Sequence, residues 1–182
     1  MTTLNAAWYN CTLVTNLPAV GALTNTTSLS STWRSCSRAV AFPAVSNLTR
    51  VTTLVAAWRD CTAATIFPEV NTLVTNTTLA ATWFGCTNML AAPAVSDLTR
   101  VTTFSGAWEG CSKITAAPGI TASAGLTNVS RAFYNCWGIT NAVPALWDTN
   151  YFGGLTNSSS YTNCFTGCTN AANWAAVPLD WR

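Results

Sequence analysis

Cysteine supplies most of the side chains in this sequence that could do chemistry. The 182-residue chain contains eight cysteines, six acidic residues and no histidine. Without histidine, a Ser-His-Asp triad, a histidine-ligated zinc ion and the commonest general base near neutral pH are all excluded. Thiol chemistry and paired carboxylates therefore remain to be considered.

The cysteines recur at an interval of 25 residues rather than in clusters. Coils stacked about 4.8 Å apart would place neighbouring thiols within disulfide reach. A zinc site needs paired ligands such as C-x-x-C, so no metal site is predicted. We interpret these thiols as small buried hydrophobic groups, with disulfide pairing as the less favoured alternative. The cysteines of this column are Cys11, Cys36, Cys61, Cys86, Cys111, Cys136 and, after an insertion of seven residues, Cys168.

Cys164 lies four residues before Cys168 and departs from this spacing. Two cysteines so close in sequence leave a local disulfide or a reactive thiol open as a minor alternative.

Carboxylates offer the other route to catalysis. Asp60 and Glu109 fall in neighbouring columns two coils apart, which corresponds to about 10 Å along the stack. This separation lies near the upper limit for an inverting glycosidase. No phosphate-binding loop or activated nucleophile accompanies the pair, so we predict a protein that is not an enzyme and needs no cofactor. The remaining ionisable candidates are Glu69, Asp97, Asp148, Asp180 and Lys113.

An aromatic residue stands three positions before each cysteine of the 25-residue column. A repeat of this length is too short for paired helices and suits a coil with one or two short strands. Segments such as VTTL are β-branched, and LVAAW has the composition of a helical turn. The sequence therefore predicts a β-rich repeat solenoid of about seven coils with short parallel strands and short helical turns. The aromatic column is Trp8, Trp33, Trp58, Trp83, Trp108 and Phe133, with Phe165 in the seventh coil.

The sequence pattern of the repeat is similar to that of a known family. The pattern V-T-x-L-x-x-A-W-x-x-C-x-x-(apolar)-T-x-x-P at 51–68 and 101–118, and LTNVSRAFYNCWGIT at 126–140, resemble the BspA-like leucine-rich repeat. The resemblance covers essentially the whole chain, although most positions expected to hold Phe hold Trp, and many expected to hold Leu hold Ala or Val. It implies a leucine-rich-repeat-like right-handed coil, a role in adhesion or display on cell surfaces or in phages, and no catalytic residues.

The two ends of the repeat array differ. We expect one domain over residues 1–182, with regular coils over 1–146 and an irregular coil and cap over 147–182. The N-terminal coil enters directly at an expected strand position without a cap, and exposed strand edges recruit partners. This predicts association with other copies, or fibre formation, through the N-terminal end.

Composition excludes several classes of protein. The chain is 49% hydrophobic and only 8% charged, with a net charge of +2 and no basic run, so nucleic-acid binding is not expected. No stretch approaches the ~20 apolar residues of a membrane span, and the first residues do not form a signal peptide. We expect a virion protein made in a host cytoplasm, or a surface protein whose sequence begins within a longer or processed polypeptide.

The column directly after the aromatic residues is the candidate binding surface. It varies in type while its neighbours do not, which indicates solvent exposure, and aromatic residues with arginine are typical of recognition sites. A solvated face is the competing interpretation. Stacking of sugars on the Trp column is disfavoured because its regularity indicates a core. The candidate binding residues are Tyr9, Arg34, Arg59, Phe84, Glu109 and Tyr134.

Threonine doublets, including Thr52-Thr53 and Thr77-Thr78, are expected to stack and favour strands. Ice binding by a Thr array, or glycosylation of sequons such as NCT at 10–12, are less favoured alternatives.

The sequence thus predicts a non-enzymatic structural or adhesive protein on a virion, as tail fibre or capsid decoration, or on a bacterial cell surface. Its expected partners are other protein subunits of a larger assembly, or a protein or glycan of a host surface. A subunit of an extracellular fibre is the alternative.

Overall fold

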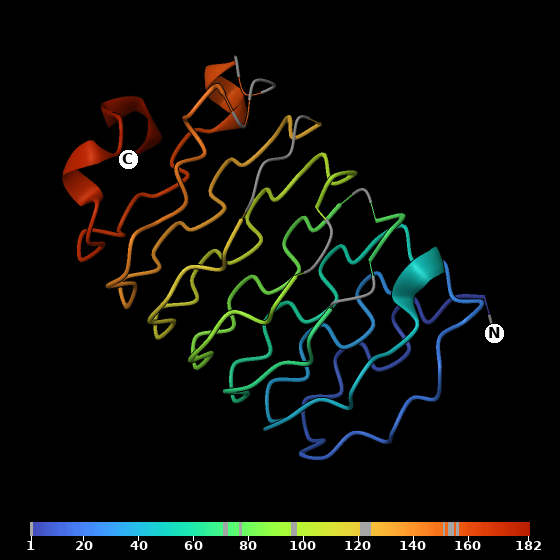
Figure 1. Cartoon of the computed structure of the whole chain (residues 1–182). Coiled ribbons are helices and arrows are strands. Elements are labelled where there is room, and N and C mark those ends of the chain that lie inside the picture. Colours follow the sequence, from blue (N-terminus) through green and yellow to red (C-terminus); the bar gives the residue numbers. More distant parts are fainter. Residues whose placement is uncertain are drawn as a thin grey trace.

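Successive 25-residue repeats lie side by side and carry the chain from one end of the molecule to the other (Figure 1). The structure is a computed structural model that describes residues 2–70, 73–76, 78–95, 98–120, 125–150, 152, 155 and 157–182. We number the repeats 1 to 7 by their aromatic residues: Trp8, Trp33, Trp58, Trp83, Trp108, Phe133 and Phe165.

Backbone hydrogen bonds join each repeat to the next. On the aromatic side, alternate N–H groups donate to carbonyl groups of the following repeat, as Trp33 does to Ala57 at 2.8 Å and Trp83 to Ala107 at 2.9 Å. At other positions the direction reverses, as where Thr52 N–H donates to the Thr27 carbonyl of the preceding repeat at 2.9 Å. The intervening N–H groups close tight turns within their own repeat.

The predicted β-rich solenoid of the leucine-rich-repeat type, with short parallel strands and helical turns, is wrong. Within the described ranges the chain forms no strand, only isolated parallel bridges such as Thr53–Thr78. Its helices there are 3-10 helices of three residues, all outside the expected helical turns, and the rest is turn and irregular chain. These helices are η1 (Leu48–Arg50), η2 (Ser158–Ser160), η3 (Trp174–Ala176) and η4 (Leu179–Trp181).

Side chains at the bridge positions prevent the bridges from extending into strands. We expected stacked Thr to favour strands, but Thr53 Oγ1 accepts a hydrogen bond from the N–H of Val55 at 3.2 Å, and Asn128 Oδ1 accepts one from Ser130 at 2.9 Å. A local side-chain acceptor of this kind competes with the strand ladder. The bridges in the column of Thr53 therefore stay isolated, and a turn follows each of them.

Left-handed residues complete the turns around each aromatic residue. In repeat 3 they are Ala56, at φ 53°, and Asp60, at φ 59°, two residues before and two after Trp58. A residue in this conformation interrupts both a helix and a strand. The expected helical turn at LVAAW is consequently a pair of tight turns.

The aromatic residues form one continuous stack through the core. Ring centroids of neighbours lie 5.2 Å apart for Trp33–Trp58, 5.9 Å for Trp58–Trp83 and 5.0 Å for Trp108–Phe133, with the planes within 10° of parallel. Rings from Trp33 to Phe165 are fully or almost fully buried. Stacked rings contribute dispersion and hydrophobic energy in every repeat, so this column is the main cohesive element of the molecule.

The C-terminal end of the stack is covered by residues after the last repeat. The Trp181 ring lies 4.5 Å from that of Tyr161, nearly parallel to it, and the Trp181 carbonyl accepts the Phe165 N–H at 2.9 Å. The Arg182 guanidinium donates to the carbonyl oxygens of Val177 and Trp174, at 2.9 and 3.0 Å, which fixes η3 against η4. At the opposite end, Trp8 is only partly buried.

Candidate functional site

The cysteine column lies inside the stack and makes a recurring hydrogen bond. Each thiol from repeat 2 onward donates to the carbonyl of the aromatic residue one repeat earlier, as Cys61 does to Trp33 at 3.0 Å and Cys136 to Trp108 at 3.0 Å. The same bonds are made by Cys36, Cys86, Cys111 and Cys168. All eight cysteines are free thiols.

Burial lowers the reactivity of the thiols from repeat 2 onward, because it raises their pKa values. Desolvation raises the pKa of Cys36 to about 11 and those of Cys111 and Cys168 to about 12. A protonated thiol is a poor nucleophile and a poor metal ligand. No cluster of three or more His, Cys, Asp or Glu side chains that could hold a metal ion occurs among the described residues.

Cys164 has a counterpart in the other repeats, which its spacing from Cys168 did not indicate. It directly precedes Phe165, so it occupies the column that holds Ala57 in repeat 3 and Thr82 in repeat 4. It is fully buried, and desolvation raises its pKa well above the usual value. Its position therefore matches a small core residue of the repeat.

The two candidate catalytic carboxylates each pair with an arginine. Asp60 Oδ2 lies 3.2 Å from Arg59 Nε, and Glu109 accepts two hydrogen bonds from Arg131, with the Nε–Oε2 distance 2.9 Å. Each carboxylate thus faces an arginine on its own surface, and the two are not arranged as a pair around a common site. Asp97 lies outside the described residues.

The predicted binding column forms contacts between repeats at the surface. The Arg34 guanidinium lies 5.5 Å from the ring centroid of Tyr9, and that of Arg59 lies 4.1 Å from Phe84. Tyr9 is 49% exposed, and Arg34, Arg59, Phe84 and Tyr134 are of intermediate burial, whereas Glu109 is 9% exposed. These side chains therefore pair rings with guanidinium groups of neighbouring repeats.

Arg131 belongs to this surface although it stands three residues before the column in its own repeat. Its guanidinium lies 4.0 Å from the Tyr134 centroid and also pairs with Glu109 of the preceding repeat. Its left-handed position, at φ 56°, is held by Ala or Ser in repeats 1 to 4. A single arginine in a column of small residues was the sequence signal for Arg131.

The candidate binding column and Arg131 together form one surface, which we name the aromatic–guanidinium surface. Its residues are Tyr9, Arg34, Arg59, Phe84, Glu109, Arg131 and Tyr134.

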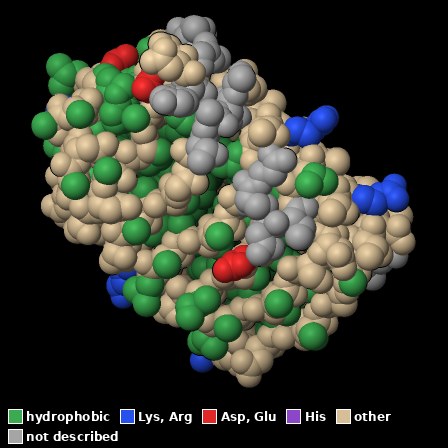
Figure 2. Space-filling model, viewed as in Figure 1, with side chains coloured by type: hydrophobic (Ala, Val, Ile, Leu, Met, Phe, Trp, Pro, Cys, Tyr) green, Lys and Arg blue, Asp and Glu red, His purple; other side chains and the backbone are tan. Residues whose placement is uncertain are grey.

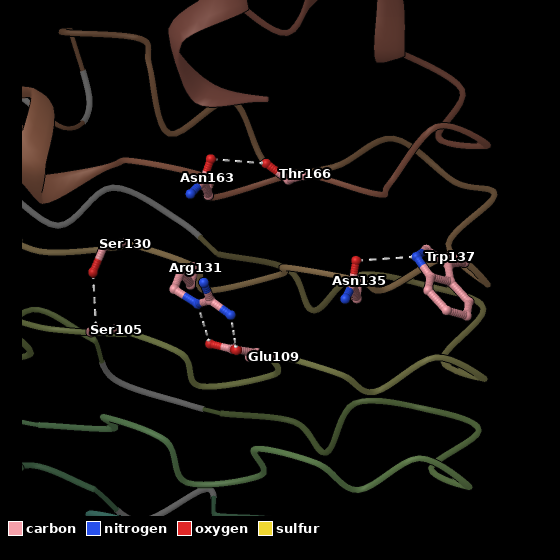
Figure 3. Close-up of polar contacts among 8 residues, drawn as sticks. All are labelled: Ser105, Glu109, Ser130, Arg131, Asn135, Trp137, Asn163 and Thr166. Carbon is pink, nitrogen blue, oxygen red and sulfur yellow. Dashed lines mark hydrogen bonds and ion pairs between the residues drawn. The ribbon is translucent and has the colours of Figure 1, made fainter.

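An exposed tryptophan next to this surface was also missed. Trp137 is 56% exposed, and it lies with Asn135 and Arg131 along repeat 6, while Glu109 lies on the adjacent repeat (Figure 3). Earlier repeats hold only Thr or Ser in its column: Thr12, Ser37, Thr62, Thr87 and Ser112. The break in that column was the sequence signal.

The threonine column uses its hydroxyl groups internally. Thr27 Oγ1 donates to the Thr2 carbonyl at 3.0 Å, and Thr127 Oγ1 donates to the Thr102 carbonyl at 3.1 Å. Thr77 lies outside the described residues. Hydroxyl protons engaged by the backbone are not offered outward, which disfavours the ice-binding alternative.

No protein-family model matches the chain, and no curated protein matches it. The resemblance to BspA-like repeats therefore stays a prediction. In the part of the chain that the structure describes, no helix is long and apolar enough to cross a membrane.

Proposed function

We propose that this protein is a non-enzymatic adhesive module of a virion or bacterial cell surface, which binds a glycan or protein through the aromatic–guanidinium surface. The contact of Arg34, Arg59 and Arg131 with aromatic rings is the observation that carries the proposal. Cation–π contacts hold long side chains in fixed positions, and a preordered surface binds with a smaller entropy cost.

The distribution of charge supports the same surface. The chain has eight basic residues, and three of them, Arg34, Arg59 and Arg131, lie here. On the face drawn in Figure 2, charged side chains are few and scattered among uncharged ones. An aromatic residue beside arginine is the composition of a binding hot spot, where a few side chains supply most of the affinity.

The test removes the Phe84 ring and the Arg59 guanidinium that contacts it. Wild-type protein is screened against immobilised glycans and cell-surface proteins, and the Arg59→Ala/Phe84→Ala variant is measured on the ligands found. We expect at least about a tenfold loss of affinity, because truncation at a hot spot costs at least about 1.4 kcal/mol.

An Arg50→Ala/Ile66→Ala variant is the matched control, because both residues are exposed outside this surface. Its affinity should equal that of the wild type. Equal loss in both variants, or no loss in the first, would contradict the proposal.

Association through the first repeat is a second candidate function. No charged residue occurs before Arg34. Trp8 stacks on Trp33 on one side at 5.6 Å, and a hollow of about 320 Å³ at this end is lined by Leu4, Trp8, Val20 and Leu23 among others. An uncharged hollow lined by both apolar and polar side chains, beside a partly exposed ring, favours a contact with another protein surface.

Sedimentation velocity over a range of concentrations tests this association. If repeat 1 is an interface, the wild type should form larger species as concentration rises, and Val20→Arg should stay monomeric, because a charge would be buried unpaired. Val74→Arg, at an exposed valine outside this hollow, is the control and should associate as the wild type does. A wild type that is monomeric throughout would exclude this function.

A further inference from the structure

Trp137 is held in one position although most of its side chain is in solvent. Its indole N–H donates to Asn135 Oδ1 at 3.3 Å, and its carbonyl accepts a hydrogen bond from Asn170 Nδ2 of the next repeat at 2.9 Å. The indole N–H is therefore already engaged, so an incoming ligand meets the face of the ring.

Two glycines allow the chain to pack closely around Trp137. A Cβ atom at Gly167 would lie 2.9 Å from Trp137 Nε1 and 3.0 Å from Cδ1, and the backbone there has φ +88°. At Gly138 a Cβ atom would lie 2.7 Å from the Ile114 carbonyl oxygen, so the chain after Trp137 packs directly against repeat 5. The exposed ring thus depends on local features that fit it closely.

Planar polar groups lie on the same face as the ring. Asn135, Arg131 and Glu109 follow one another away from Trp137, and Arg131 and Glu109 are fixed by their mutual ion pair (Figure 3). Amide, guanidinium and carboxylate groups together can donate to and accept from hydroxyl groups. The surface around Trp137 therefore combines an exposed apolar ring with hydrogen-bond donors and acceptors.

We propose that Trp137 is the stacking platform for a neutral sugar ring of a glycan ligand. The proposal rests on the proposed adhesive function and specifies its ligand class. The negatively polarised face of an indole attracts the C–H groups on one side of a pyranose, and the sugar hydroxyls at its edge reach the polar groups. A proline-rich peptide is favoured less, because it binds in a groove between aromatic rings, and here one ring stands among polar side chains.

The experiment uses cellohexaose, laminarihexaose and chitohexaose as neutral sugar probes, and a proline-rich decapeptide as the competing probe. Binding is measured by calorimetry and by protection of tryptophan fluorescence from acrylamide quenching, and the protection that Trp137→Ser abolishes is assigned to Trp137. We compare the wild type with Trp137→Ser, which restores the residue type of the column, and Trp137→Phe, which keeps a smaller ring. Ile66→Ser is the control, because it also replaces an exposed apolar side chain by serine.

We expect at least one sugar to bind and to protect the fluorescence. Trp137→Ser should weaken binding about tenfold or more, Trp137→Phe less, and Ile66→Ser not at all, with unchanged melting temperatures in all three variants. No protection by any of the sugars, sugar binding that is equal in Trp137→Ser, or Trp137-dependent binding of the decapeptide instead would each overturn the inference. Ligand binding that depends on Arg59 and Phe84 but not on Trp137 would overturn it and leave the adhesive function standing.

Discussion

Replacing Trp83 by alanine should lower the free energy of unfolding by about 3–5 kcal/mol. The Trp83 ring is fully buried between Trp58, at 5.9 Å, and Trp108, at 5.4 Å. Alanine would leave a cavity in the middle of the aromatic column and remove contacts to two neighbouring repeats at once. Urea unfolding followed by circular dichroism measures the loss.

Trp83→Phe is the matched control for this substitution. Phe133 already occupies the same column, at 5.0 Å from Trp108. The Trp83 indole N–H is buried without a hydrogen-bond partner, so removing it relieves a desolvation cost of about 1–3 kcal/mol and offsets the lost ring area. We expect a change within about 1 kcal/mol. Equal destabilisation by alanine and phenylalanine would show that ring stacking is not the main cohesive element.

Alkaline pH should unfold the protein by ionising its buried thiols. Desolvation raises the pKa of the Cys36 thiol from 9.0 to about 11 and that of Cys111 to about 12, and those of Cys86 and Cys136 rise well above 9.0. The unfolded chain therefore releases protons near pH 9 while the folded chain still retains them. Stability that is complete below pH 9 is lost as the pH rises towards the folded values.

The expected loss is more than about 5 kcal/mol between pH 8 and pH 11, because one pKa unit corresponds to about 1.4 kcal/mol for each thiol. Urea midpoints measured in reducing buffer across this range give the slope. The control is Cys86→Ala, which removes one buried thiol and should make the slope shallower, at a cost of about 1–2 kcal/mol at pH 7 from the lost packing and hydrogen bond. A midpoint that stays constant to pH 11 would mean that the thiols are not buried as described.

The sequence could predict which side chains share a column, because one inward residue per 25 is a packing constraint visible in the spacing. Trp33, Trp58 and Trp83 do stack directly on one another. It could not predict the backbone between columns. Thr53 is a strand-forming residue by composition, yet its hydroxyl accepts a neighbouring N–H, and Ala56 adopts a left-handed conformation that alanine does not favour. A local side-chain acceptor decides the first, and the second goes with a hydrogen bond from Ala56 N–H to the Ala80 carbonyl of the next repeat at 3.0 Å.

The candidate site was predictable in part for the same reason. Variation at Arg59 and Phe84 marked a column free of core packing, but the sequence could not show that a guanidinium of one repeat lies on a ring of the next. Arg131 and Trp137 stand in columns of small residues, and their role depends on partners from other repeats, Glu109 for one and Gly167 for the other. Such contacts follow from the stacking geometry rather than from local sequence.

Mapping the ligand-contact surface by NMR shows whether the aromatic–guanidinium surface binds the ligand. Amide and side-chain spectra of the isotopically labelled 182-residue chain are recorded with and without a ligand identified by the binding screen. We predict that the largest shifts gather at Arg34, Arg59, Phe84, Arg131 and Tyr134, with little change at the exposed residue Ile66, which lies outside this surface. Shifts that gather at Ile66 and its neighbours, and leave the aromatic–guanidinium surface unchanged, would contradict the account.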